Sequence, residues 1–217
     1  MEPDRYFGEL DYLELSLLYA GPAKLTKWAA FAGKLGLVAP FSLTHRQVPP
    51  GNKLWPNDAT TGDFRDSPTS RATLPPLREA ITAVSASCVV FRSPESFSPS
   101  AGNRDALRKF FTEIATFEVP RVWIPGGLWN VPTTVKMAAE LGVVPAIDPL
   151  VREPGVPLES MFDLEVSALY LRSSAAVRSE QMEDLAALIE HYEAIPVTVA
   201  FASPNRWQDA RNLKKLF

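Results

Sequence analysis

The stretch that most constrains the fold is Arg121–Leu150, RVWIPGGLWNVPTTVKMAAELGVVPAIDPL. Its first part, Arg121–Ile124, is short, β-branched and aromatic, and the Pro-Gly-Gly that follows ends it, which predicts a strand. Val131–Leu141 carries apolar residues at helical spacing. Val143–Ile147 is a second apolar run, which Asp148 and a proline end. The pattern predicts a strand, a helix and a second strand.

The ends of the predicted helix support this interpretation. Pro132 stands in the first turn, where proline is tolerated, and Gly142 stands where helices terminate. The expected buried stripe consists of Val135, Met137, Ala138 and Leu141. A helix between two apolar strands is the crossover that parallel strands need, so the stretch predicts an α/β protein.

Composition sets wide limits on function. The chain has 217 residues, 46% hydrophobic and 22% charged, which suits a single globular domain over residues 1–217. A net charge of −3 disfavours nucleic acid as a partner, although a local basic patch would allow it. The one cysteine, Cys88, rules out an internal disulfide framework. Since no apolar run approaches the roughly 20 residues of a membrane span, and the start lacks signal-peptide character, we expect a cytoplasmic protein without membrane contact.

The same alternation of elements runs through the rest of the chain. The expected strands, besides the two above, are Tyr12–Leu17, Val38–Thr44, Cys88–Phe91, Ala168–Leu171 and Val197–Phe201. The expected helices are Ala23–Gly36, Leu74–Ser85, one with Asn103 as N-cap, Ser179–Glu193 with Ser179 as N-cap, and Arg206–Phe217. Arg46–Thr73, rich in proline and polar residues, is expected to be a long irregular loop, either functional or a disordered insertion. Val151–Glu165 is a second irregular stretch.

Seven strands with intervening crossovers predict either a β/α barrel or a doubly wound sheet. No glycine-rich phosphate motif follows the first strand, which disfavours a Rossmann fold. We therefore expect a TIM-type barrel that is incomplete or irregular, with seven recognisable strands and the first of the usual eight missing. Two unpaired edges would result, and they would be covered by loops or by a second copy in a homodimer. Whether a strand lies upstream of Met1 is open.

The sequence resembles the YecE-like family, a TIM-barrel family also called domain of unknown function 72. The resemblance rests on motifs that occur in the family's order along nearly the whole chain. They are YF…DYLELSLLY from Tyr6, FSLTH at Phe41–His45, VVFRSPESF at Val89–Phe97, VWIPGGLW at Val122–Trp129, AIDP at Ala146–Pro149, YLR at Tyr170–Arg172 and the closing Phe201…Asp209-Ala210…Leu213. The resemblance implies a barrel whose biochemical role is unsettled. Some relatives are similar to metal-dependent barrel nucleases, which is an analogy between folds.

Several family features are absent. The glycine-rich end of the first strand has no counterpart before Tyr6. The carboxylate that many members place in the fifth strand falls on Ile124. The seventh-strand R-x-H-G is replaced by Arg172-Ser173-Ser174-Ala175, and the terminal F-N-N by Phe201-Ala202-Ser203. The polar set of the family is thus reduced.

Barrel sites lie at the carboxyl ends of the strands, and this rule selects the candidate residues. Arg92 and Arg172 are predicted to bind an anion through bidentate hydrogen bonds. Trp123 and Trp129 could stack against a ligand, or could simply pack helix against sheet. Ser203 also stands at a strand end, whereas His191 is expected on a helix surface.

Three residues are candidates for chemistry: Asp148, His45 and Glu14. Asp148 could be a base, a metal ligand or a turn former. His45 could be a general base or could fix the loop that follows it. Glu14 could pair with Arg172 to orient a substrate, or the pair could be structural. No cofactor is predicted. With two histidines in the chain a multi-metal site is disfavoured, while a single Mg²⁺ stays open.

The leading hypothesis is a barrel that binds a small anionic ligand, phosphate- or sugar-phosphate-like, at its C-terminal mouth. One alternative is a non-catalytic binding or scaffold protein derived from the family. Another is a metal-dependent phosphodiesterase or nuclease. Whether the protein is an enzyme, and its substrate, are left open by the sequence.

Overall fold

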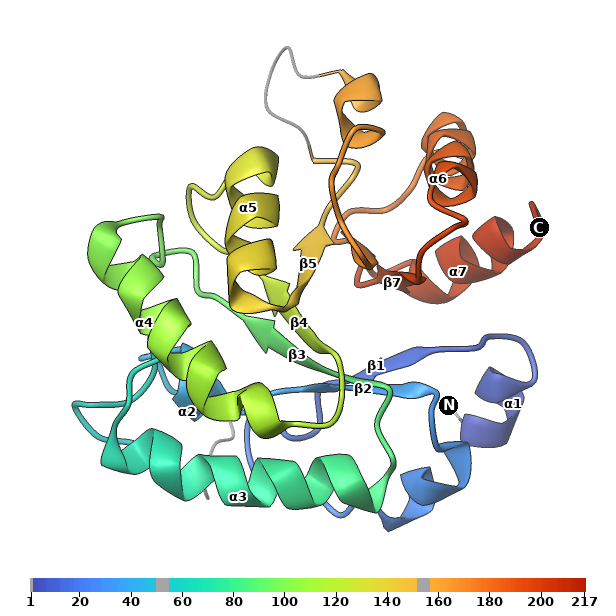
Figure 1. The fold of residues 1–217 in the computed structure, drawn as a ribbon. Helices are drawn as coiled ribbons and strands as arrows, with labels where there is room; N and C mark the ends of the chain where they lie inside the picture. Colours follow the sequence, from blue (N-terminus) through green and yellow to red (C-terminus); the bar gives the residue numbers. More distant parts are fainter. Residues whose placement is uncertain (1, 50–54, 152–156) are drawn as a thin grey trace.

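The computed structural model describes residues 2–49, 55–151 and 157–217. Its framework is a sheet of seven parallel strands in the order β1 to β7, each hydrogen-bonded to the next along the chain (Figure 1). The strands are β1 Leu13–Leu15, β2 Leu35–Val38, β3 Cys88–Arg92, β4 Arg121–Ile124, β5 Val144–Ile147, β6 Leu169–Ser173 and β7 Val197–Phe201. The sheet curls into a nearly closed, incomplete TIM-type barrel, as predicted.

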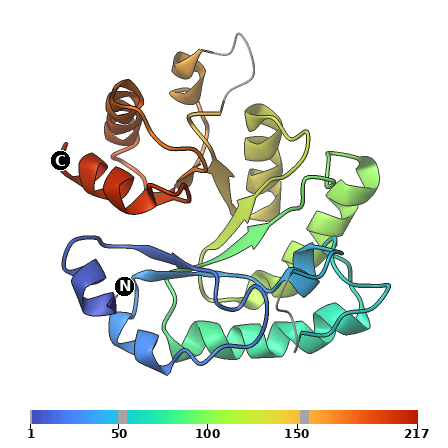
Figure 2. The same cartoon turned by 180° about the vertical axis from the view of Figure 1, so that it is seen from behind.

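The helices lie mainly on the outside of the sheet (Figures 1 and 2). The α-helices are α1 Pro3–Phe7, α2 Phe41–Thr44, α3 Pro68–Ala83, α4 Ala101–Glu113, α5 Val131–Leu141, α6 Ser179–His191 and α7 Arg206–Lys214. Three 3₁₀ helices accompany them: η1 Thr26–Phe31, η2 Ile114–Thr116 and η3 Leu158–Met161. Within the described residues, no helix has the length and apolar character of a membrane span.

Between β7 and β1 the barrel is open, because the described strands pair only from β1 through β7. Helices α1 and α7, rather than strands, meet beside this opening. The Arg211 guanidinium lies 2.7 Å from the Glu9 carboxylate, and Lys214 Nζ lies 2.7 Å from Asp11. The Tyr6 and Trp207 rings have centroids 5.2 Å apart. Contacts within the chain therefore border the gap that we expected loops or a second copy to cover.

Alternation along each strand separates two cores. Inside the barrel, Val38, Cys88, Val90, Val122, Ala146, Tyr170 and Ala200 form one buried cluster. The intervening residues, such as Phe91 and Trp123, point outward and pack under the helices. This alternation decides which residues at the strand ends face the interior.

The stretch Arg121–Leu150 folds as predicted. β4 and α5 have the expected bounds, and β5 begins one residue later than expected. The Asn130 side chain caps α5 by accepting from Thr133 N at 3.0 Å. Gly142 ends α5 with φ of 63°, in the left-handed region that suits glycine.

Two neighbouring predictions near the N-terminus were wrong. The expected helix Ala23–Gly36 is only the 3₁₀ helix η1, and Leu35 and Gly36 belong to β2. Gly36 is in a strand because of a close approach: a Cβ there would overlap the Tyr12 hydroxyl group. The expected strand Val38–Thr44 ends at Val38, and the short helix α2 follows. Tertiary pairing overrode the local helical pattern.

The expected loop Arg46–Thr73 was also partly wrong, because α3 already begins at Pro68. Ser67 caps α3 in a capping box with Ser70, at 3.1 Å and 3.0 Å. Of the rest, 50–54 lies outside the described residues, as does 152–156 of the second irregular stretch.

The part of the loop next to α3 is packed. Gly62, Asp63 and Phe64 have successive positive φ angles, and their amides donate to the carbonyls of Ser42, Thr44 and Leu43 in α2. Phe64 is buried against Phe97, Phe110 and Phe111. These bonds and contacts hold a backbone conformation that non-glycine residues rarely adopt.

Two helix caps differ from expectation. Ser100, not Asn103, is the N-cap of α4, and its Oγ accepts from Asn103 N at 3.2 Å. Arg178, not Ser179, precedes α6. Since Ser, Asn and Asp near a helix start compete for the capping position, the pattern alone left the start uncertain by a few residues.

Candidate functional site

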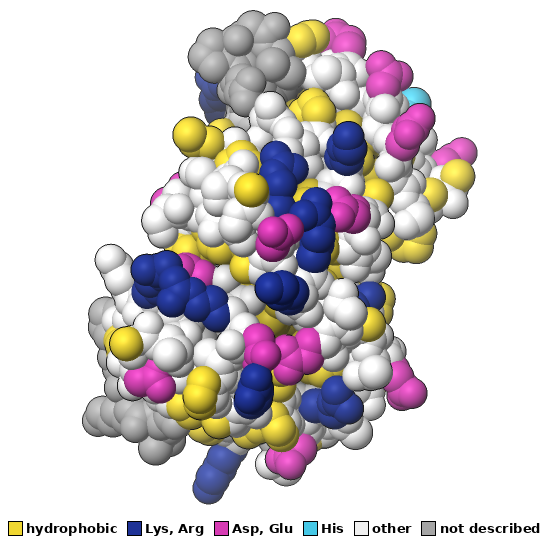
Figure 3. All heavy atoms as spheres, turned by 60° about the vertical axis from the view of Figure 1, so that its left-hand side comes forward, with side chains coloured by type: hydrophobic (Ala, Val, Ile, Leu, Met, Phe, Trp, Pro, Cys, Tyr) yellow, Lys and Arg dark blue, Asp and Glu magenta, His cyan; other side chains and the backbone are white. Residues whose placement is uncertain are grey.

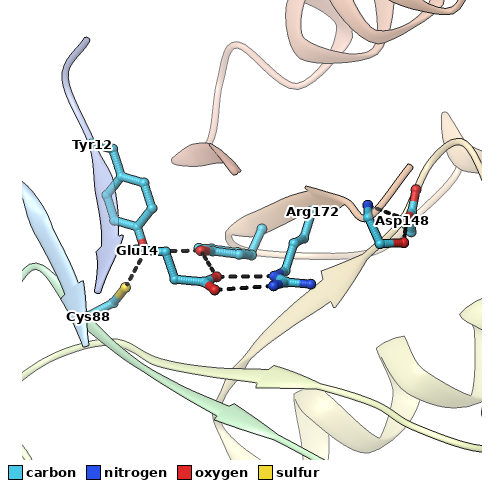
Figure 4. A network of polar contacts seen from close by, with 7 residues as sticks. Tyr12, Glu14, Cys88, Asp148 and Arg172 are labelled. Atoms are coloured by element: carbon cyan, nitrogen blue, oxygen red, sulfur yellow. Dashed lines mark hydrogen bonds and ion pairs between the residues drawn. The ribbon is translucent and has the colours of Figure 1, made fainter. Parts of the chain in front are cut away.

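A polar network crosses the interior of the barrel (Figure 4). Arg172 on β6 donates through Nε and Nη2 to the two carboxylate oxygens of Glu14 on β1, at 3.1 and 3.2 Å. The Tyr170 hydroxyl donates to Glu14 Oε2 at 2.8 Å. The Tyr12 hydroxyl lies 3.0 Å from that of Tyr170 and 3.4 Å from Cys88 Sγ. The predicted pairing of Glu14 with Arg172 is therefore present.

The direction of the hydrogen bonds in the network follows from its proton count. Tyr170 has one hydroxyl proton, which it gives to Glu14, so Tyr12 donates to Tyr170. The thiol of Cys88 is then the donor to Tyr12. Two tyrosines and a cysteine thus form a chain of donors that ends on the Glu14 carboxylate, which also faces Arg172.

Burial keeps the chain protonated. It raises the pKa of the Cys88 thiol to about 11, with the Glu14 charge adding to the effect. It also raises the pKa of both tyrosines, and for Tyr170 the nearby Glu14 carboxylate is the next cause. Because these groups stay neutral around pH 7, they act as hydrogen-bond donors that position Glu14, not as acids or bases.

A cavity of about 410 Å³ opens at the C-terminal ends of β3 to β6. This is the mouth where the barrel rule places a site. Its lining comprises Arg92, Ser93, Glu95, Ile124, Pro125, Trp129, Val131, Thr134, Ala146, Ile147, Asp148, Val151, Arg172 and Ser174. Both predicted anion-binding arginines line this one cavity.

The two arginines differ in how they are paired. Arg172 is held by Glu14, and the side chains of the pair are 13% and 15% exposed. Arg92, by contrast, makes no ion pair within the described residues, and its guanidinium lies over the Tyr19 ring, 5.9 Å from its centroid. Next to Arg92 in the strand register stands Ile124, where the family resemblance led us to look for a carboxylate. Arg92 is therefore the cation free to meet a ligand.

Asp148 lies at the mouth but is already well supplied with donors. Its Oδ2 accepts from Ser174 N at 3.0 Å and Ser174 Oγ at 2.9 Å (Figure 4), and its Oδ1 accepts from Leu150 N at 3.1 Å. These bonds tie the end of β5 to the residue after β6. Asp148 thus forms the turn that the sequence allowed, and it also lines the cavity.

The two tryptophans pack edge-to-face with ring centroids 4.9 Å apart, but Trp129 lines the cavity and Trp123 does not. Trp123 is paired with Phe91, points outward, is 0% exposed and donates to Ser93 Oγ at 2.8 Å. It has no face for a ligand, so its predicted ligand-binding role is corrected to packing. Trp129 donates to the Phe97 carbonyl at 2.7 Å and lines the cavity. Trp129 alone remains a candidate for ligand contact.

His45 follows α2 instead of ending a strand, and it is not part of the cavity lining. Its Nδ1 lies 2.7 Å from Thr44 Oγ1, and its ring packs edge-on against Tyr19. Burial lowers the pKa of His45 to about 4, with the Arg92 charge acting in the same direction and Asp63 opposing it. A neutral imidazole beside the packed loop fits the loop-fixing alternative better than a general base.

The other polar candidates have structural partners. Ser203 is fully buried and donates to Asp209 Oδ2 at 2.9 Å at the start of α7. His191 lies on the surface of α6, as expected, with its Nε2 2.8 Å from the Phe162 carbonyl.

Three groups in or beside the site were not singled out from the sequence: Tyr170, Glu95 and Thr134. Tyr170 was detectable, because strand alternation puts it on the same face as Arg172. Glu95 and Thr134 lie in a loop and a helix, and their approach to the mouth depends on tertiary packing.

The side chains of the cavity do not match the set of metal ligands that a nuclease-type metal centre uses. Asp148 and Glu95 are the acidic residues of the lining. Among the residues that the structure describes, no three of the types His, Cys, Asp and Glu gather in a way that could hold a metal ion. Such centres use several of these ligands together.

Comparison with solved structures agrees with this fold. A DUF72 family protein from Enterococcus faecalis V583 superposes with a TM-score of 0.68 and 12% identity, over 98% of this chain and 91% of that one. This chain has the fold of a DUF72 protein. The finding supports the YecE-like (DUF72) resemblance that the sequence motifs indicated.

Other matches are weaker. An archaeal fructose-1,6-bisphosphate aldolase reaches a TM-score of 0.41 at 15% identity, over 64% of this chain and 61% of its own. A Schiff base forming fructose-1,6-bisphosphate aldolase has the same score and identity, over 88% and 81%. Scores this low do not bear on function. No family model matches the sequence, and no curated protein matches it.

Proposed function

We propose that this chain is a barrel protein that binds a small anionic ligand, of the phosphate or sugar-phosphate kind, in the cavity at its C-terminal mouth. The observation that carries the proposal is Arg92. Its guanidinium lines the cavity and makes no ion pair within the described residues. A half-buried guanidinium with unused donors is well suited to a phosphate or carboxylate, which accepts two parallel hydrogen bonds from it.

Two neighbours strengthen the case. Arg172 lines the same cavity, and its Nε and Nη2 are used by Glu14, which leaves Nη1 for a ligand. Helix α5 begins beside the cavity, with Val131 and Thr134 in the lining. The positive end of the helix dipole favours a nearby anion.

A small ligand suits the surface better than nucleic acid does. On the face shown in Figure 3, Lys and Arg side chains are interspersed with Asp and Glu side chains and form no continuous basic area. Binding to a polyanion usually needs such an area. We propose the cytoplasm as the compartment, in line with the buried thiol of Cys88, which is not in a disulfide bond.

The scaffold alternative would be favoured by a mouth filled with hydrophobic side chains. The cavity is instead open and partly charged, which supports binding over a purely structural role. The phosphodiesterase alternative loses support because the required metal ligands do not gather in the described residues.

Titration calorimetry with inorganic phosphate at low ionic strength tests the proposal. We expect Arg92→Gln to weaken phosphate binding about tenfold or more, because a charge-assisted hydrogen bond contributes roughly 1.5–3 kcal/mol. Arg108→Gln is the matched control. Arg108 is an exposed arginine paired with Glu140 on the helical surface, so its loss changes net charge equally without touching the cavity. Equal weakening in both variants would refute the proposal, and so would a wild-type protein that binds neither phosphate nor a sugar phosphate.

A further inference from the structure

The charges around the cavity are not those of a simple phosphate site. The charge of Arg172 is offset by Glu14, which leaves Arg92 as the unpaired cation. Two carboxylates, Asp148 and Glu95, line the same cavity. A bare phosphate dianion would therefore face one free cation and two negative groups, an unfavourable balance.

The same carboxylates can accept hydrogen bonds from a ligand. Glu95 is exposed, and within the described residues its carboxylate accepts one long hydrogen bond, from Gly127 N at 3.3 Å. A carboxylate offers about four lone-pair positions, so Glu95 has several unused and Asp148, with three bonds, has about one. Their natural complement is a ligand that donates hydrogen bonds beside its anionic group.

A buried hydroxyl group in the lining adds an independent observation. Thr134 on α5 is 2% exposed, and its Oγ1 has no hydrogen-bond partner within the described residues. Buried polar atoms without partners are rare in folded proteins, because each costs roughly 1–3 kcal/mol. Thr134 lines the cavity while its Oγ1 is itself buried, so a rotation of the side chain about χ1 would let Oγ1 meet a ligand hydroxyl group.

The size of the cavity points the same way. At about 410 Å³ it falls in the range of roughly 300–1,000 Å³ typical of sites for organic ligands. Trp129 adds a small aromatic area to the wall, because it is 9% exposed, has the Arg104 guanidinium over its ring and has its indole nitrogen bonded to the Phe97 carbonyl. An aromatic wall with hydroxyl and carboxylate groups around it suits the mixed apolar and hydroxylated faces of a sugar.

We propose that the ligand is a small phosphorylated sugar or polyol, with its phosphate on Arg92 and its hydroxyl groups on Asp148, Glu95 and Thr134. This rests on the proposed anion binding at the same cavity and selects among the anions that could bind there. The phosphate supplies the charge that Arg92 needs, and the hydroxyl groups turn the two carboxylates from repelling groups into acceptors.

The experiment compares ribose 5-phosphate, inorganic phosphate and ribose by titration calorimetry on the whole chain. We expect ribose 5-phosphate to bind at least tenfold more tightly than phosphate, and ribose to bind weakest. Asp148→Asn should reduce the affinity for ribose 5-phosphate several-fold and should leave phosphate affinity equal or slightly higher, because it removes a negative charge.

Thr134→Val tests the buried hydroxyl group with a side chain of nearly the same shape. We expect it to lower the affinity for ribose 5-phosphate several-fold, to leave phosphate affinity unchanged, and to keep the unfolding midpoint equal or higher. A midpoint in urea measured beside the titrations shows that the variant is folded. Unchanged ribose 5-phosphate affinity in a folded Thr134→Val variant would overturn the assigned contact.

The outcomes separate the two proposals. If phosphate binds through Arg92 and ribose 5-phosphate binds no more tightly, the sugar-phosphate inference fails while anion binding stands. If neither phosphate nor ribose 5-phosphate binds, both fail. If an amino acid such as glutamate binds more tightly than ribose 5-phosphate, the carboxylates serve an ammonium group and the inference is wrong.

Discussion

The Glu14 carboxylate and the Arg172 guanidinium join β1 to β6 through the interior of the barrel, although β1 and β6 are not neighbours in the sheet. The pair spans the side on which β7 and β1 lack a connecting strand. An interior ion pair thus links the edge strand β1 to β6, the strand beside the other edge, across an opening that backbone hydrogen bonds would close in a complete barrel.

We expect Glu14→Gln to destabilise the fold by about 2–4 kcal/mol, because it leaves Arg172 largely buried without its carboxylate. The same change should tighten phosphate binding, since it frees the Arg172 charge beside the cavity. Urea unfolding and phosphate titration measure the two effects. Glu140→Gln, which breaks an exposed pair with Arg108, is the control and should change stability very little. Equal stability losses in the two variants would contradict the role of the interior pair.

Gly36→Ala should lower stability by about 1–3 kcal/mol, because the added methyl group would overlap the Tyr12 hydroxyl and force apart β2 and the polar network. Gly102→Ala, in the first turn of α4 with open space around the added group, is the matched control and should be neutral or slightly stabilising. Thermal or urea unfolding of both variants measures the difference in stability. A neutral Gly36→Ala would mean that Tyr12 moves away freely.

The lowered pKa of His45 predicts that the folded protein loses stability in mild acid. Its folded pKa of about 4 lies below its ordinary value of 6.5, so the unfolded chain binds more protons between these values. Stability should fall as the pH drops from about 6.5 toward 4, by about 1–2 kcal/mol after allowance for solvent screening of a half-buried group. The urea unfolding midpoint should depend less steeply on pH in the His45→Gln variant than in the wild-type protein. Parallel slopes in the two proteins would exclude His45 as the cause.

Cys88 should be unreactive in the folded protein. Its thiol is 6% exposed and has a pKa of about 11, so the thiolate that attacks disulfides is scarce near neutral pH. We expect reaction with an aromatic disulfide reagent at pH 8 to be at least about a hundredfold slower in native protein than in urea. Comparable rates in both conditions would show that the interior network opens readily.

The sequence could be used to predict the elements whose signals are local. The Arg121–Leu150 unit was placed to within a residue because Pro132, Gly142 and two apolar runs mark its boundaries directly. The region around Gly36 failed for the opposite reason. Its apolar spacing imitates a helix, and only the neighbouring strands β1 and β3 make it a strand.

For the site, the sequence by itself determined where β3, β5 and β6 end, and so placed Arg92, Asp148 and Arg172 at one mouth. Only the tertiary structure decided which of them is free. Strand register sets Ile124 beside Arg92, alternation turns Trp123 outward, and the curl of the sheet brings Glu14 onto Arg172. The physical reason is that strand-end position is encoded along the chain, whereas ion pairing and burial depend on residues from strands far apart in sequence.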